Sequence, residues 1–147
     1  MTNIAQMVNV LQAMILTDGP DMVLTPTYHV FEMYKPFQGA TALPVSYDAP
    51  DYSHGDYTIP AISLSAAKTP DGKLVVALIN SDAKAAHAVD ISAFGASAFT
   101  GRILTADAMD AHNTFEAPEA VTPSPFEVEG GVANLPPHSV VVLTGEE

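Results

Sequence analysis

Apolar residues at steps of three and four positions dominate the start of the chain. The spacing that lines one face of an α-helix is kept by Ile4, Met7, Val8, Leu11, Met14 and Ile15. Val10, Ala13 and Leu16 are also apolar, so this helix would be buried nearly all round. Asp18-Gly19-Pro20 supplies a stop. The pattern predicts one long helix within residues 1–20, of a kind that lies between other elements of a multilayer domain.

A second, shorter helix is predicted within residues 21–42. Met22-Val23-Leu24 is a short apolar run, which we expect to form a connecting strand. Thr25 then stands as an N-cap with Pro26 at the first helical position, and the helix should run to about Lys35. Pro36 and Gly39 end it.

The remaining residues, 43–147, have the pattern of an antiparallel β-sandwich. In 62–66, apolar residues alternate with serines, and Thr69-Pro70-Asp71-Gly72 is a turn sequence. Residues 73–80 then read as a hairpin partner buried on both faces. Further short strands are expected at 86–91, 99–104, 126–128, 131–135 and 139–143, with loops at 48–57 and 107–124. The fold class is therefore mainly β, preceded by one long and one short α-helix.

Composition excludes some partners and suggests a larger parent. The 147 residues are 48% hydrophobic and only 15% charged, so we expect part of the apolar surface to face a partner or a further domain. A net charge of −12, from 17 acidic and 5 scattered basic residues, argues against nucleic acid and against an anionic membrane. Cysteine is absent, which excludes disulfides and thiolate metal sites.

Targeting signals are not evident in this sequence. No segment reaches the roughly 18 to 20 apolar residues that span a bilayer, and the start lacks the basic region of a signal peptide. We therefore expect a cytoplasmic protein, although a signal on any preceding segment would lie outside this sequence.

The sequence carries no strong catalytic or metal motif. The five histidines lack metal-ligand spacing, and there is no G-x-S-x-G elbow or phosphate loop. The densest group of potential ligands is Asp48, Asp51, His54 and Asp56, which reads either as a metal site or, in our interpretation, as a solvated loop. Glu32 is the one acid on an apolar helix, and we interpret it as structural. We expect no metal and no cofactor.

Two amides open the first predicted helix. Asn3 and Gln6 lie one helical turn apart, and amides can both donate to and accept from sugar hydroxyls. They could equally cap the helix or pair with neighbouring loops. Both interpretations stay open on the residues alone.

A family resemblance bears on these positions. The run Asn3-Ile-Ala-Gln6-Met-Val-Asn9-Val-Leu-Gln12-Ala-Met-Ile-Leu16, with Met22-Val-Leu-Thr-Pro-Thr-Tyr-His-Val-Phe-Glu-Met-Tyr34, closely resembles the C-terminal third of glycoside hydrolase family 51 α-L-arabinofuranosidases. Leu135-Pro-Pro-His-Ser-Val140 is similar to the last strand of their accessory domain. The resemblance implies a (β/α)8 barrel followed by a jelly-roll-like sandwich. Residues 1–20 would be the last barrel helix, 21–42 the connecting strand and helix, and 43–147 the sandwich.

What the resemblance implies about function is specific. Gln6 matches a glutamine that binds the arabinofuranose, at the rim of an active site formed by the strand ends of the barrel. The two glutamates of the retaining mechanism belong to upstream strands, so this segment would carry no catalytic residue. The implied partners are arabinofuranosyl oligosaccharides bound through the complete enzyme, the upstream barrel and further copies in a homo-oligomer.

Two other classes of protein remain as alternatives. One is a free-standing carbohydrate-binding sandwich, for which Tyr47, Tyr52 and Tyr57 are the only clustered aromatic candidates. The other is a purely structural or oligomerising domain.

Overall fold

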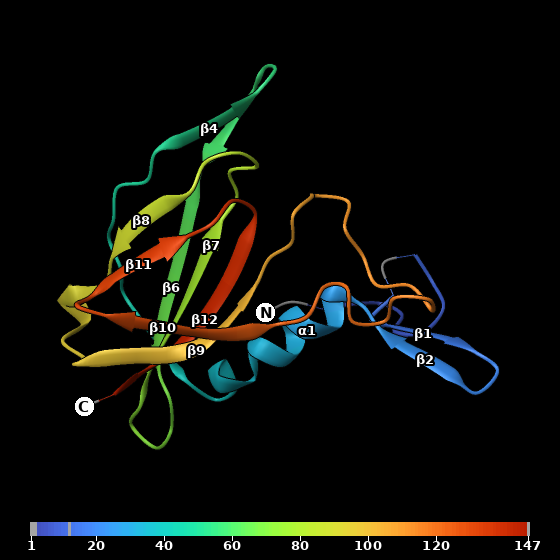
Figure 1. The fold of residues 1–147 in the computed structure, drawn as a ribbon. Helices are drawn as coiled ribbons and strands as arrows, with labels where there is room; N and C mark the ends of the chain where they lie inside the picture. The colour runs from blue at the N-terminus through green and yellow to red at the C-terminus, as the bar shows by residue number, and fades with distance from the viewer. Residues whose placement is uncertain (1–2, 12, 147) are drawn as a thin grey trace.

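A six-stranded antiparallel sheet forms the centre of the computed structural model, which describes residues 3–11 and 13–146 (Figure 1). The strand order is β10-β9-β12-β7-β6-β3. The strands are β3 (Thr41–Leu43), β6 (Ile62–Lys68), β7 (Leu74–Asn80), β9 (Ala98–Leu104), β10 (Ser124–Glu129) and β12 (Ser139–Glu146).

A second layer covers one face of this sheet. It consists of β8 (His87–Asp90) paired antiparallel with β11 (Val132–Leu135), and η2 (Ser92–Phe94) follows β8. Ala133 and Leu135 of β11 join the same core cluster as Leu78 of β7 and Val141 of β12. The predicted antiparallel sandwich is confirmed, and the strands predicted from residue 62 onward are present.

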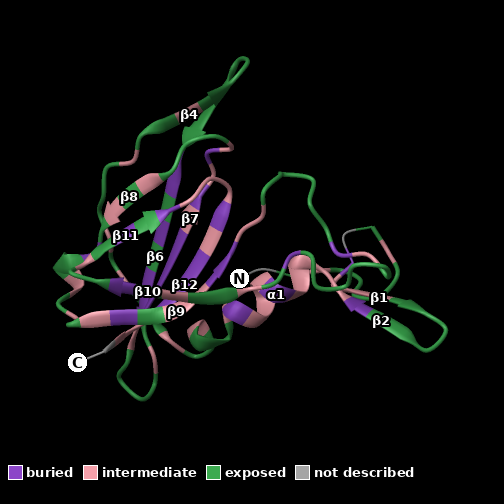
Figure 2. Cartoon of the chain, viewed as in Figure 1, coloured by how far each residue is buried: buried purple, intermediate pink, exposed green. Residues whose placement is uncertain are grey.

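The opposite face of the sheet is covered by helix α1 (Pro26–Met33). Met33 forms a second core cluster with Ala77 of β7, Val142 of β12 and Val121. Because successive side chains of a strand point to opposite faces, β7 and β12 are buried on both sides (Figure 2). The prediction that residues 73–80 are buried on both faces is confirmed.

Helix α1 begins and ends close to the predicted positions. The Thr25 hydroxyl oxygen accepts a hydrogen bond from the Tyr28 amide at 3.4 Å, and Pro26 occupies the first turn. A 3₁₀ turn, η1 (Lys35–Phe37), follows. The short helix is therefore confirmed, and strand β2 (Asp21–Leu24) precedes it as expected.

The long helix predicted within residues 1–20 is wrong for this chain. The described residues from 3 to 14 are irregular, Asn9 has a positive φ of 51°, and Ile15–Asp18 is strand β1, paired with β2. Residues 1, 2 and 12 lie outside the described residues. Asp18-Gly19-Pro20 does not stop a helix: Gly19, with φ of 55°, is the first loop residue of this hairpin.

The predicted helix does not form because the described chain does not pack around it. A helix that is apolar all round gains its stability from packing on several sides. Here Met7, Val8 and Leu11 remain exposed, with Leu11 at 94%. Nothing in the described chain buries a helix at this position, and local hydrogen bonds hold the segment in another form.

A second correction concerns the loop predicted at 48–57. Most of it forms a hairpin of β4 (Asp51–His54) and β5 (Tyr57–Pro60), which projects beyond the end of the sheet (Figure 1). The Asp, Ser and Gly residues that suggested a loop lie in a solvent-exposed hairpin, which needs no buried face. By contrast, residues 107–123 carry no helix or strand, as predicted. In the part of the chain that the structure describes, no helix has the length and apolarity to cross a membrane.

Candidate functional site

The N-terminal arm, residues 3–24, holds the only residue expected to contact substrate. Gln6 is exposed in its irregular first part, and not at the start of a helix. The Asn9 side chain fixes the arm by donating to the Thr17 hydroxyl at 2.9 Å and accepting from the Thr17 amide at 2.7 Å. The Met7 carbonyl accepts from the amides of Met14 and Ile15, both at 3.0 Å. The chain thus presents Gln6 to solvent from a folded-back arm.

A buried amide joins this arm to the sandwich. Asn113, only 3% exposed, lies in the loop between β9 and β10. Its side chain donates to the carbonyls of Leu24, at 2.7 Å, and Val121, at 3.0 Å, and it accepts from the Val121 amide at 2.7 Å. Leu24 ends β2, and Val121 packs in the core below α1. Asn113 therefore closes its own loop through Val121 and links that loop to Leu24, which is distant in sequence.

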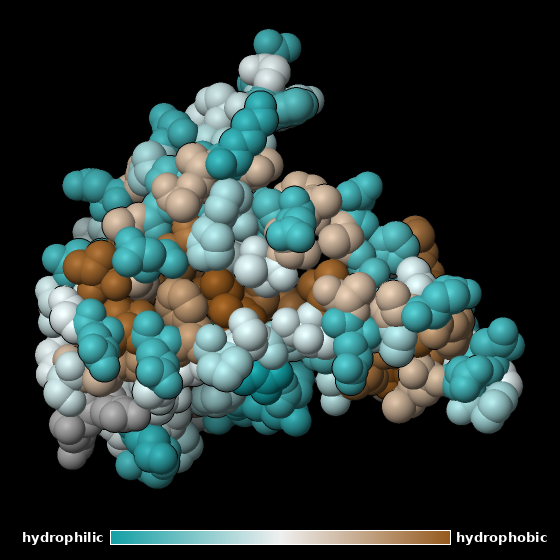
Figure 3. Space-filling view, viewed as in Figure 1, coloured by the Kyte–Doolittle hydropathy of each residue, from teal (hydrophilic) through white to brown (hydrophobic). Residues whose placement is uncertain are grey.

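Large hydrophobic residues are exposed on the arm and on the loop tied to it. We call them the N-terminal apolar set: Met7, Val8, Leu11, Met22, Met109 and Phe115. Among the described residues they are six of the ten large hydrophobics with high exposure. Figure 3 shows hydrophobic side chains at the end of the molecule that carries β1 and β2. Exposed apolar residues concentrated in this way mark an interaction surface.

Glu32, the one acid on the apolar helix, forms an ion pair. Its Oε2 lies 2.6 Å from Nη1 of Arg102 on β9, and both side chains are partly exposed. Next to Arg102, a Cβ on Gly101 would overlap the Val142 carbonyl oxygen, so the strands approach closely there. The arrangement attaches α1 to the sheet and agrees with the structural interpretation of Glu32.

A histidine is buried beside this pair. His29 of α1 is 9% exposed, and its Nε2 has no hydrogen-bond partner among the described residues. Burial lowers the pKa of His29 below its usual value, the Arg102 charge lowers it further, and Glu32 opposes both. His29 is therefore neutral at pH 7.

The acidic cluster and the tyrosines belong either to the β4–β5 hairpin or to the irregular segment that leads into it. Asp48, Asp51, His54 and Asp56 are all exposed, and no group of three or more His, Cys, Asp or Glu suited to a metal occurs in the described part of the chain. The Tyr47 hydroxyl accepts from the Leu64 amide at 3.0 Å, so Tyr47 is tied to β6. The three tyrosines thus do not form one platform.

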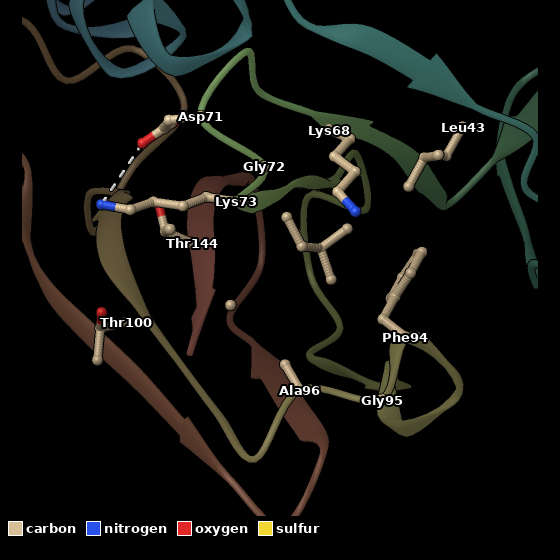
Figure 4. Close-up of a pocket in the computed structure, with 12 residues that line it drawn as sticks. Leu43, Lys68, Asp71, Gly72, Lys73, Phe94, Gly95, Ala96, Thr100 and Thr144 are labelled. Carbon is tan, nitrogen blue, oxygen red and sulfur yellow. Dashed lines mark ion pairs between the residues drawn. The ribbon is translucent and has the colours of Figure 1, made fainter. Parts of the chain in front are cut away.

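A hollow of about 930 Å³ lies around the β6–β7 turn, at the end of the sandwich away from the β4–β5 hairpin (Figure 4). Its residues come from five places in the sequence: Leu43 of β3, Lys68 to Leu74 around the β6–β7 turn, Phe94 to Ala96, Thr100 of β9, and Thr144 and Gly145 of β12. Sequence reasoning missed it because no two of these segments are adjacent in the chain.

Comparison with known proteins assigns the family. The model of the α-L-arabinofuranosidase C-terminal domain matches residues 1–139. The chain belongs to this family. This C-terminal domain is 44% identical, over 151 aligned residues, to the intracellular exo-α-L-arabinofuranosidase of Bacteroides ovatus, covering 97% of the chain and 29% of that protein.

Solved structures extend the comparison. The domain superposes on the crystal structure of the GH51 arabinofuranosidase from Xanthomonas axonopodis pv. citri with a TM-score of 0.86 and 48% identity, over 97% of this chain and 30% of that one. For a family 51 enzyme from Bifidobacterium longum, the values are 0.78 and 27%, over 97% and 30%. The domain therefore spans less than a third of the length of these relatives, and the resemblance to family 51 is confirmed.

Proposed function

We propose that this domain is the C-terminal portion of a retaining α-L-arabinofuranosidase. The complete enzyme would hydrolyse terminal non-reducing α-L-arabinofuranosyl residues from arabinose-containing polysaccharides and oligosaccharides. The observation that carries this proposal is the similarity over 97% of the chain to enzymes named for that activity. Because the Bacteroides ovatus relative is named intracellular, we also propose a cytoplasmic location.

The segment alone should be inactive. A retaining glycosidase needs one carboxyl group to protonate the leaving oxygen and a second to attack the anomeric carbon, about 5 Å apart. Glu32 is paired with Arg102, and Glu116, Glu119, Glu127 and Glu129 are exposed side chains. Two glutamates on an upstream barrel would supply the chemistry instead.

For this segment we propose a structural role: it packs on the preceding domain through the N-terminal apolar set. Exposed Leu11, Met7 and Met22 are costly in water, and burying one such side chain contributes about 1.5 to 3 kcal/mol. Residues 1–20 would then take their final form against the barrel, with Gln6 as a contact to the arabinofuranose. We propose that the complete enzyme also associates with copies of itself.

The reading frame upstream of the Met1 codon tests the parent function. The 29% share of the Bacteroides ovatus protein predicts on the order of 350 further residues, with eight strand–helix units and two glutamates at strand ends. A stop codon shortly before Met1, in the genomic DNA, would contradict the proposal.

The structural role has its own test in the complete enzyme. Leu11→Asp should lower its melting temperature and release the domain to proteolysis, because a charge would face the barrel. Val132→Asp, at an exposed residue of β11 outside the N-terminal apolar set, is the matched control. Equal effects of the two substitutions would refute the proposed docking surface.

A further inference from the structure

Thr25 stands at the junction between the N-terminal arm and helix α1. Its amide donates a hydrogen bond to the Met14 carbonyl at 3.0 Å. Its hydroxyl lies 2.8 Å from the Ala13 carbonyl oxygen and 3.2 Å from that of Met14, and it donates to this pair. The same hydroxyl oxygen accepts from the Tyr28 amide and caps α1. One half-buried side chain therefore donates to the arm and accepts from the helix.

The helix side of this junction is fixed to the sheet. Met33, at the end of α1, is 4% exposed and packs in one core cluster with Ala77 of β7. Glu32, one residue earlier, is paired with Arg102 of β9. Because α1 is held to the sheet by both an apolar and a charged side chain, the hydrogen bonds of Thr25 fix the arm relative to the sandwich.

A second attachment lies one residue before the junction. The Leu24 carbonyl accepts a hydrogen bond from the side chain of Asn113 at 2.7 Å. Asn113 is 3% exposed, and its bonds to Val121 fix it in place. Figure 1 shows the β9–β10 loop, which carries Asn113, reaching from the sheet to the arm. The sandwich thus holds two consecutive residues, Leu24 and Thr25, through two different elements.

Hydrogen bonds within the arm connect this junction to Gln6. Met14, whose carbonyl is held by Thr25, donates its own amide to the Met7 carbonyl at 3.0 Å. The Ile15 amide donates to the same Met7 carbonyl, also at 3.0 Å. Gln6 directly precedes Met7 in the sequence. The path from Thr25 to the residue beside Gln6 is therefore two hydrogen-bonded steps long, through Met14 and Met7.

We propose that Thr25, braced by Asn113, is a positioning residue for Gln6 in the complete enzyme. This inference rests on the proposed function, in which Gln6 contacts the arabinofuranose. A side chain that binds substrate must be held in one place, since a misplacement of about 1 Å lowers the rate by on the order of 100-fold. Packing of the preceding domain on the N-terminal apolar set would add to this junction, which lies on the sandwich side of the arm.

Substitutions of Thr25 in the complete enzyme separate its two roles. Thr25→Asp keeps an acceptor for the Tyr28 amide, because aspartate is a good N-cap, but it puts a carboxylate against the arm carbonyls in place of a donor. We expect kcat/KM for 4-nitrophenyl α-L-arabinofuranoside to fall about tenfold. Thr25→Ser keeps both donor and acceptor and should stay within about twofold of wild type.

The matched control removes a hydroxyl donor elsewhere in the sandwich. Ser139 is buried, and its hydroxyl donates to the Pro136 carbonyl at 2.8 Å, in the turn before β12. Ser139→Ala should stay within about twofold of the wild-type kcat/KM, because this hydrogen bond makes no contact with the arm. An equal loss for Thr25→Asp and Ser139→Ala would overturn the inference.

A Gln6→Ala background distinguishes positioning of Gln6 from a general structural effect. Without the Gln6 amide, Thr25 has no side chain to position, so Thr25→Asp should lower kcat/KM by less than about twofold in that background. An equal loss in both backgrounds would overturn the inference. Should Thr25→Asp fail to fold, the nearly isosteric Thr25→Val, which loses donor and cap together, takes its place in the same comparison.

Two outcomes separate this inference from the proposed function. Gln6→Ala with wild-type kcat/KM would overturn the inference, because there would be no sugar contact to position, and would leave the arabinofuranosidase activity standing. A complete wild-type enzyme that does not hydrolyse the arabinofuranoside would refute the proposed function and this inference together.

Discussion

Replacing Asn113 by alanine should destabilise the domain far more than its loop position suggests. The substitution removes three hydrogen bonds, two of them fully buried ones to Val121. The Val121 amide and carbonyl would be left without these partners, at a cost of about 1 to 3 kcal/mol each. The Leu24 carbonyl is only half-buried, so water can replace its lost donor. We expect a loss of about 2 to 6 kcal/mol, a large part of the 5 to 15 kcal/mol of a typical domain.

Urea unfolding of the purified chain measures this loss, and the neighbouring residue supplies the control. His112 is exposed, and its Nδ1 contacts only the Asp110 carbonyl, at 2.7 Å, within the same loop. His112→Ala should therefore change the free energy of unfolding by no more than about 0.5 kcal/mol. Equal effects of Asn113→Ala and His112→Ala would refute the reasoning.

Asn113→Asp sharpens the test, because it keeps the acceptor for the Val121 amide but turns the donor toward Leu24 and Val121 into a second acceptor. A carboxylate facing two carbonyl oxygens should destabilise at least as much as alanine at pH 7. Protonation at lower pH restores a donor, so the deficit relative to wild type should narrow on acidification. A deficit that is constant with pH would show that the donor side of Asn113 is unimportant.

Three further outcomes follow from the contact between α1 and the sheet. Gly101→Ala should cost about 3 kcal/mol or more in urea unfolding, because its methyl group would overlap the Val142 backbone; wild-type stability would contradict the close approach. Glu32→Gln should cost at most about 1 kcal/mol, and less at high salt, since the pair with Arg102 is partly exposed. The folded-state pKa of His29 lies below its usual 6.5, so the unfolded chain takes up a proton first and stability should fall as the pH drops below 6.5. His29→Gln should therefore weaken the dependence of the melting temperature on pH in this range. An unchanged dependence would be inconsistent with the buried neutral ring.

The sandwich was predictable because its signals are local. The alternation in Ile62–Lys68, the turn at Thr69–Gly72 and the apolar run after it each act within a few residues, and the observed hairpin has the predicted register of buried positions. Thr25 and Pro26 likewise mark the start of α1 with two neighbouring residues.

The arm was not predictable for the opposite reason. The helical period of residues 3–16 indicates which side chains would be buried on one face, but whether a helix forms depends on which other elements pack against that face. In the described chain the Asn9–Thr17 hydrogen bonds prevail instead. Asn113 gave no signal either, because a buried amide and a solvated one look alike in a polar loop. Gly101 did give one, since a glycine inside a strand indicates close backbone approach.

The family assignment and the expectation for Gln6 came from resemblance rather than from periodicity. The residues alone were compatible with two roles of the Gln6 amide, contact with a sugar or capping of a helix. In the described chain Gln6 is exposed. Its proposed role therefore depends on the preceding domain, which would have to bring the arabinofuranose to it.

Hydrolysis of 4-nitrophenyl α-L-arabinofuranoside by the purified 147-residue chain tests the central claim most directly. The account predicts release of 4-nitrophenol at the rate of the buffer blank, because Glu32 is paired with Arg102 and the catalytic glutamates are proposed to belong to the preceding domain. Turnover that is clearly above the blank and is abolished by Glu32→Gln, with folding retained, would contradict it.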